Sequence, residues 1–204
     1  AVRKLLGELV GAAALLAANI KFNGTVVLQL QGDGPIGLIV VECHADLGMR
    51  ATVKIRDGYD VPEDGTLQTL LSPGGNGRFS VVLDPQDRHA GQQPYQGIVA
   101  MQGDTVAEVL EHYMATSEQL QTRMWLAADA NCTAGLLLQK LPDQGGHSVA
   151  AAADAPGAEG TADADKEADL ADTWDRAQHL AETNKPEELL TVTPDTIIRR
   201  LYWQ

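Results

Sequence analysis

Cysteine is scarce in this sequence, and its placement excludes a zinc site of the usual kind. Only Cys43 and Cys132 occur among 204 residues, and they form neither a C-x-x-C nor a C-x-C arrangement. A structural zinc site needs four nitrogen or sulfur ligands. Cys43 and His44 are an isolated pair, more simply interpreted as a small apolar residue at a strand end followed by a loop histidine. We therefore expect no metal ligand and no bound cofactor within these residues.

Aromatic residues, positive charge and long apolar runs are also in short supply. Aromatics make up 4% of the sequence, so the core must consist of Val, Leu, Ile and Ala. The net charge of −13 argues against nucleic acid or an anionic membrane as a partner, because both attract basic surfaces. The longest apolar run, residues 10–18, is too short to span a bilayer and lacks the flanks of a signal peptide. We expect a cytoplasmic protein.

Motifs of common catalytic sites are missing too. The sequence has no Gly-Lys-Ser/Thr phosphate loop, no H-E-x-x-H and no G-x-S-x-G. Glu111 and His112 are adjacent, but successive helical residues point about 100° apart, so we interpret both as part of a solvated helix face. We therefore predict that the chain is not an enzyme and has no catalytic residue. The histidines are scattered, at His44, His89, His112, His147 and His179.

The most distinctive stretch is the turn that follows the first strand. Apolar residues recur at every second position of residues 25–31, which predicts a strand with one face on a core. Residues 32–35 then end the strand, and a second apolar run predicts a hairpin. A partial repeat at residues 98–104 leads instead into a helix through a capping box. Asp33 and Asp104 are therefore predicted to be a turn residue and a helix-start residue, not catalytic carboxylates.

The rest of the first 142 residues alternates between helical and strand periodicity. The expected helix at residues 2–19 carries an apolar stripe and a second stripe of small residues, which would let another backbone approach closely. Because the strands follow one another mostly in hairpin order, with two packed helices, we predict an α+β fold with a largely antiparallel sheet. Further expected elements are strands at 49–55, 78–83 and 95–101, a helical turn at 66–71, a helix at 105–117 and a hairpin of 123–128 with 133–140.

The composition changes after Pro142. Residues 143–168 are rich in Ala, Gly and Asp and cannot bury enough apolar surface to order themselves, so we expect a flexible acidic linker. Through residues 169–204 apolar residues recur at helical spacing, and Pro186 and Pro194 open short helices. Helices this short need another surface to pack on. The expected organisation is a core domain at residues 1–142, the linker, and a C-terminal helical segment.

The turn after the first strand also carries a family resemblance. Residues 29–35, Gln-Leu-Gln-Gly-Asp-Gly-Pro, resemble the QLQGDGP signature of the redox-regulated 33 kDa chaperonin family, whose members are bacterial heat-shock holdases. Further matches keep the family's order along nearly the whole chain, so the sequence is identified as a member of this family. These matches are residues 96–99, 102–105, 110–113, 117–120, 122–123, 187–191 and 200–202.

The resemblance implies an ATP-independent chaperone that binds unfolding polypeptides during oxidative and heat stress and releases them to foldase chaperones. Members of the family form homodimers. Their redox switch is a C-terminal zinc module, whose cysteines form disulfides and release the metal on oxidation. A strand and a helix are expected before Ala1 and the zinc module after Gln204, so zinc is expected in the full-length protein only. Neither Cys43 nor Cys132 matches a family ligand.

We hypothesise that the C-terminal helices cover an apolar face of the sheet at rest and expose aliphatic surface to client proteins when released. Ordinary core packing explains each candidate residue as well. Two alternatives stay open: a ligand-binding module that uses the turn at residues 31–34, and a dimerisation core whose client binding lies elsewhere. The candidate client-binding residues are Leu170, Trp174, Leu180, Leu189, Leu190, Ile197, Ile198 and Leu201. The signature residues with an expected structural role are Gln31, Gly32, Asp33, Gly34, Pro35, Gly103 and Asp104.

Overall fold

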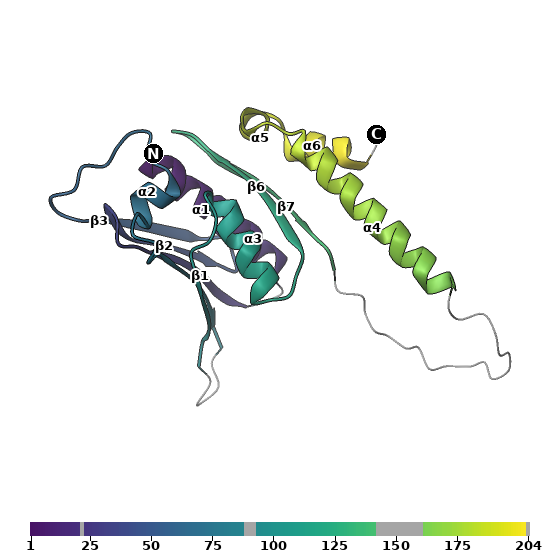
Figure 1. Ribbon diagram of the computed structural model, residues 1–204, viewed down its shortest axis with the longest axis horizontal. Coiled ribbons are helices and arrows are strands. Elements are labelled where there is room, and N and C mark those ends of the chain that lie inside the picture. The colour runs from purple at the N-terminus through teal and green to yellow at the C-terminus, as the bar shows by residue number, and fades with distance from the viewer. Residues whose placement is uncertain (21–22, 88–92, 142–160, 203–204) are drawn as a thin grey trace.

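The computed structural model describes residues 1–20, 23–87, 93–141 and 161–202, with the backbone alone at residues 161–170 and 202. It confirms the predicted α+β fold with antiparallel sheets (Figure 1). The helices are α1 (Val2–Asn19), α2 (Leu67–Leu71), α3 (Val106–Thr116), α4 (Thr161–Glu182), α5 (Pro186–Thr191) and α6 (Pro194–Tyr202). The strands are β1 (Gly24–Gln31), β2 (Ile36–His44), β3 (Met49–Ile55), β4 (Arg78–Pro85), β5 (Tyr95–Ala100), β6 (Thr122–Ala128) and β7 (Thr133–Gln139).

The larger sheet has five strands in the order β3-β2-β1-β4-β5. On the central strand β1, Leu28 lies opposite Val41 of β2 and Val81 of β4. All three side chains are buried, because residues that lie directly opposite one another on paired strands point to the same face of the sheet. Helices α1 and α3 cover that face, and the opposite face is left open by the elements that the structure describes (Figure 1). The buried core is largely aliphatic, as the composition predicts.

The smaller sheet is the two-stranded hairpin β6–β7, which lies on the far side of α1 and α3 from the larger sheet (Figure 1). The small-residue stripe of α1 makes this packing close: a Cβ on Gly7 would lie 2.6 Å from Cβ of Ala128. Thr133 of β7 donates a hydrogen bond from Oγ1 to the carbonyl of Gly7 at 2.6 Å. The backbone that approaches this stripe is therefore a hairpin of the same chain.

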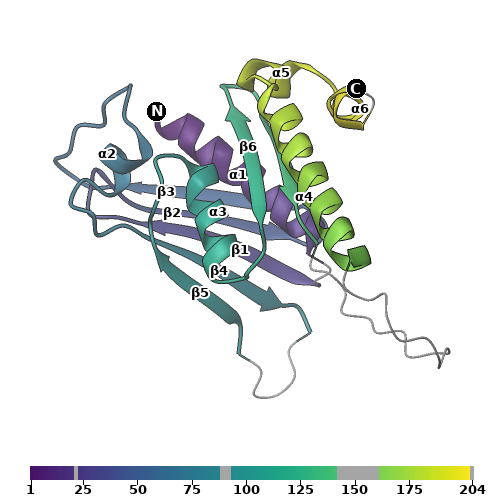
Figure 2. The same ribbon diagram turned by 45° about the vertical axis from the view of Figure 1, so that its right-hand side comes forward.

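The C-terminal helices form the outermost layer. Helix α5 contacts both strands of the β6–β7 hairpin, α4 contacts β6, and α6 packs on α4 (Figure 2). Helix α4 begins at Thr161, inside the stretch expected to be linker. The part of the predicted linker at residues 143–160 lies outside the described residues. The hairpin is thus sandwiched between α1 and α3 on one side and the C-terminal helices on the other.

Candidate functional site

The signature turn between β1 and β2 is hydrogen-bonded to the C-terminal end of α2. The backbone N–H groups of Asp33 and Gly34 both donate to the carbonyl of Leu71, at 2.9 and 3.2 Å. A Cβ on Gly32 would overlap that same carbonyl oxygen, and a Cβ on Gly34 would lie 2.5 Å from the oxygen of Leu70. Glycine is therefore required at both positions by the close approach of two backbones.

Asp33 is used within the fold. Its carboxylate accepts hydrogen bonds from Asn76 Nδ2 at 2.8 Å and from the backbone N–H of Gly74 at 3.3 Å. The hydrogen bond from Asn76, more than that from Gly74, holds the pKa of Asp33 below its usual value. Each oxygen of the carboxylate thus accepts a hydrogen bond from the loop after α2. The carboxylate fixes this loop and shows no geometry that would serve proton transfer.

The glycines of this turn also have the G-x-G-x-x-G spacing of a dinucleotide site, at Gly32, Gly34 and Gly37. In such a site a helix follows the glycines and its N-terminus receives the pyrophosphate. Here the strand β2 begins at Ile36, so no helix N-terminus faces the turn. A small hollow of about 270 Å³ lies beside it, and Arg56 Nη2 donates to the carbonyl of Gly32 at 2.5 Å. The arrangement does not support a nucleotide site.

The second signature stretch starts α3. Gly103 has a φ of 123°, in the region that favours glycine, and its carbonyl accepts a hydrogen bond from Gln68 of α2 at 2.5 Å. Thr105 is the N-cap and accepts from the backbone N–H of Glu108, while Glu108 Oε2 accepts from the backbone N–H of Asp104 at 2.6 Å. These contacts satisfy two of the backbone amides at the helix start.

The C-terminal helices rest on an apolar surface formed by the β6–β7 hairpin. Leu189 of α5 and Ile197 of α6 are 7% and 5% exposed and cluster with Ala127 of β6. Trp125 and Leu136 of the hairpin are partly buried beside them. The covered surface is thus the outer face of the two-stranded sheet, and the five-stranded sheet takes no part in it.

The other candidate client-binding residues differ in how far they are covered. Trp174, Leu180, Leu190 and Leu201 are partly buried. Ile198 is 46% exposed and lies outside this cluster. The side chain of Leu170 lies outside the described residues. The apolar contact is therefore concentrated on α5 and on the inner face of α6, and α4 contributes little to it.

Polar contacts hold α5 and α6 to one another. Arg200 of α6 donates from Nη1 to Glu188 Oε1 at 3.0 Å, and the backbone N–H of Lys185 donates to Glu188 Oε2 at 3.1 Å. The hydrogen bond from Lys185, and after it the one from Arg200, lower the pKa of Glu188. The Arg200–Glu188 contact links the two short helices, which we call the α5–α6 unit.

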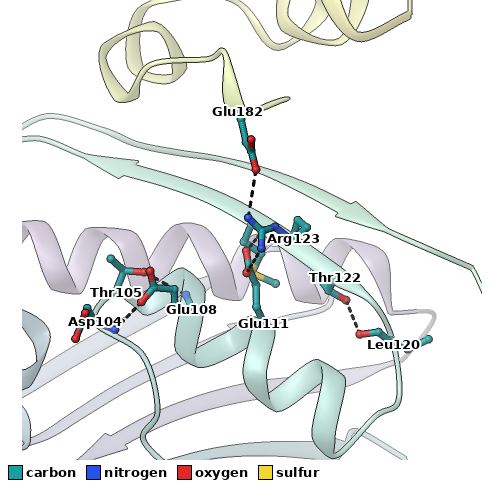
Figure 3. A network of polar contacts seen from close by, with 9 residues as sticks. Asp104, Thr105, Glu108, Glu111, Leu120, Thr122, Arg123 and Glu182 are labelled. Atoms are coloured by element: carbon teal, nitrogen blue, oxygen red, sulfur yellow. Dashed lines mark hydrogen bonds and ion pairs between the residues drawn. The ribbon is translucent and has the colours of Figure 1, made fainter. Parts of the chain in front are cut away.

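A polar cluster around Arg123 joins α3, β6 and α4 (Figure 3). Arg123 Nη1 lies 3.4 Å from Glu111 Oε2 of α3, and Nη2 lies 3.5 Å from Glu182 Oε1 of α4. Glu111 also accepts a hydrogen bond from the backbone N–H of Met124 at 2.6 Å. Burial raises the pKa of Glu111, which the bonds from Met124 and Arg123 partly offset.

This cluster corrects one expectation. Glu111 was interpreted as part of a solvated helix face, but only 17% of its side chain is exposed because β6 lies across it. The periodicity of α3 gives no signal for this contact, since the partners come from a later strand and a later helix. A cavity of about 650 Å³ borders the cluster between α3, β6 and α4, and its lining includes His112, Lys140 and Trp174.

Metal-binding and membrane-spanning features are not seen in the part of the chain that the structure describes. No group of three or more His, Cys, Asp or Glu residues there could hold a metal ion. Cys43 is a buried free cysteine, whose pKa is raised by burial, and Cys132 is an exposed free cysteine at the β6–β7 turn. None of the described helices is long and apolar enough to cross a membrane.

The fold is that of a known class of protein. The chain is similar to the crystal structure of the 33 kDa chaperonin, a heat shock protein 33 homologue, from Thermotoga maritima, with a TM-score of 0.68 over 98% of this chain and 61% of that one. The two sequences are 17% identical, so this likeness establishes the fold alone.

Sequence comparison identifies the family. The family model described as Hsp33 protein matches residues 1–204, and the chain belongs to this family. It is 44% identical to the 33 kDa chaperonin of Methylobacillus flagellatus over 98% of this chain and 59% of the relative. It is 41% identical to the 33 kDa chaperonin of Chromobacterium violaceum over 99% of this chain and 58% of the relative. The chain therefore spans less than two thirds of the length of these relatives.

Proposed function

We propose that this chain is the core and helical segment of an ATP-independent chaperone, a holdase that binds unfolding polypeptides under heat and oxidative stress. The names of its relatives support chaperone activity. The observation that carries the proposal is the apolar contact between the α5–α6 unit and the hairpin. Leu189 and Ile197 bury there on helices of 6 and 9 residues, which are too short to be stable on their own.

Release of the α5–α6 unit would uncover apolar surface on both partners. On the hairpin this surface includes Trp125, Ala127 and Leu136, and on the helices it includes Leu189 and Ile197. Burial of apolar area favours association without reading the identity of the side chains. The exposed surface would therefore bind many unfolding proteins with low sequence specificity, as a holdase requires.

The regulation proposed for the full-length protein follows from the family resemblance. Oxidation of cysteines beyond Gln204, with release of zinc, would free the C-terminal helices. The described residues do not fit a zinc site, because Cys43 is buried in the core on β2 of the larger sheet and Cys132 lies at the β6–β7 turn. Both cysteines therefore stay outside the proposed switch. A homodimer, transfer of clients to foldase chaperones and a cytoplasmic location complete the proposal.

The proposal is tested by thermal aggregation of an unrelated protein in the presence of the 204-residue chain. We expect suppression without oxidant, since neither Cys43 nor Cys132 takes part in the proposed switch. Suppression that depends on peroxide would contradict this. A chain that dimerises but protects no client would favour the dimerisation core. Loss of protection by Asp33→Ala in a folded protein would favour the ligand-binding module, and the hydrogen bonds of Asp33 within the fold argue against that outcome.

A further inference from the structure

We propose that Arg123 is a positioning residue for α4, and that its ion pair with Glu182 sets how readily the C-terminal helices leave the hairpin. The inference rests on the proposed function, because it concerns the release of the same helices. It assigns the opening of α4 to a particular electrostatic contact, which acts in addition to the apolar contact between the α5–α6 unit and the hairpin.

The geometry places Arg123 between two carboxylates that belong to different layers of the molecule. Glu111 lies on α3, beneath the hairpin, and Glu182 lies at the end of α4, above it (Figure 3). The guanidinium reaches Glu111 with Nη1 and Glu182 with Nη2. A single side chain of β6 thereby links the core helix to the first of the C-terminal helices.

Helix α4 has few other attachments to the rest of the chain. Among its described side chains Ala181 alone is fully buried, and a cavity of about 650 Å³ lies between residues 171–178 of α4 and the elements α3 and β6. Within the described residues, the Arg123–Glu182 pair is the one ion pair that joins α4 to the core. Its loss is therefore not compensated by a neighbouring polar contact.

The guanidinium also has a partner within the core that does not involve α4. Glu111 is fixed by the hydrogen bond from the backbone N–H of Met124, and it anchors one end of the Arg123 fork. The Nε atom of Arg123 is buried without a hydrogen-bond partner among the described residues, so the Nη groups are the part of the side chain that faces carboxylates. An arginine with a fixed fork loses less conformational freedom when it forms a second pair.

The pair is weak enough to serve as a release point. The side chains of Arg123 and Glu182 are 42% and 50% exposed, and exposed pairs of this kind contribute little and are screened by salt. Loss of the pair is expected to change the opening of α4 about two- to fivefold. The corresponding free energy is small compared with the stability of a domain. It nevertheless matters for α4, because this helix buries little apolar surface.

The test is hydrogen exchange of the backbone amides of α4 in the intact protein. Glu182→Gln removes the pair, Glu182→Arg opposes it with a like charge, and both leave the Arg123–Glu111 contact in place. Asp172→Asn is the matched control, because Asp172 pairs with Arg176 within α4 at 3.7 Å and does not reach the core. We expect exchange in α4 to rise about two- to fivefold in Glu182→Gln, further in Glu182→Arg, and not in Asp172→Asn.

Salt separates an electrostatic role from a packing role. At about 1 M NaCl the screening length is near 3 Å. The exchange rate of α4 in the parent protein should then approach that of Glu182→Gln, whereas the exchange rate of Glu182→Gln itself should change little with salt. An equal response to salt in both proteins, or an equal effect of Asp172→Asn, would overturn the inference. If α4, α5 and α6 all open faster in Glu182→Arg but client aggregation is not suppressed better, the role of Arg123 stands and the proposed function fails.

Discussion

The α-carbon of Gly32 lies so close to Leu71 that no side chain fits between them. A Cβ at Gly32 would overlap the carbonyl oxygen of Leu71, and the same oxygen accepts hydrogen bonds from the two residues that follow Gly32. The signature turn is therefore a joint between the larger sheet and α2. Its most distinctive residues act through backbone geometry, which agrees with a structural role.

Gly32→Ala should destabilise the fold by about 1–3 kcal/mol, because backbone atoms on both sides must shift to admit the methyl group. Urea unfolding monitored by circular dichroism measures this. Gly37→Ala, at the second residue of β2, is the control: its Cβ would lie 3.1 Å from Nε of Arg56, a side-chain atom and not backbone. Equal loss of stability in both variants would show that close approach to Leu71 is not the cause.

Leu189→Ala should loosen the C-terminal helices without unfolding the core. Removing a buried leucine side chain costs about 2 kcal/mol or more, and here the loss falls on a unit that opens separately. We expect faster hydrogen exchange in α5 and α6, and little change in the urea midpoint of the core. Ile198→Ala is the matched control, since Ile198 is 46% exposed, and it should stay within about 0.5 kcal/mol. Loss of global stability in Leu189→Ala would mean that these helices belong to the core.

Glu8→Gln tests a partly buried carboxylate of α1. Burial raises the pKa of Glu8, and Lys4, at 3.8 Å, only partly offsets this. A carboxyl whose pKa is higher in the folded state contributes stability below its unfolded pKa, and this contribution is lost as the pH rises through the folded value. The stability of the parent protein relative to Glu8→Gln should therefore decrease as the pH rises above 4.5. Urea titrations across this range measure the difference, and a constant difference would contradict the assignment.

Gly97 of β5 and Tyr113 of α3 should be coupled. A Cβ on Gly97 would lie 2.5 Å from the Tyr113 hydroxyl, which donates to Glu118 at 2.6 Å. Tyr113→Phe alone should cost about 1 kcal/mol for the lost hydrogen bond. Gly97→Ala should cost less in the Tyr113→Phe background than in the parent, by about 0.5 kcal/mol or more. Additive losses in the double-mutant cycle would show that the hydroxyl does not limit the space at Gly97.

Local patterns predicted most of the secondary structure. Alternation on β1 and the turn residues after it gave the first hairpin, and Thr105 with Glu108 marked the start of α3, as the structure confirms. These signals come from residues that are close in sequence, so they do not depend on contacts with the rest of the chain. The start of α4 at Thr161 was missed, because alanine-rich, acidic composition suggests a linker while alanine itself has a high helix propensity.

The candidate surface could be predicted only in part. The spacing of apolar residues in the C-terminal segment indicated helices that need a partner, and Leu189 and Ile197 are indeed buried. Which surface covers them could not be read from the same spacing. The β6–β7 hairpin presents apolar residues on both faces, so its sequence does not say that α1 and α3 take one face and α5 and α6 the other.

By itself the sequence determined most of the strands and helices and the cap of α3, because periodicity and capping depend on near neighbours, whereas the glycines of the signature turn are required by the backbone of α2. The tertiary structure alone decided that the hairpin lies between two layers of helices, that the small residues of α1 receive Ala128 and Thr133, and that Arg123 meets Glu111 and Glu182. These contacts join positions far apart in the chain. They follow from the order in which the layers stack, and no local pattern of residues encodes that order.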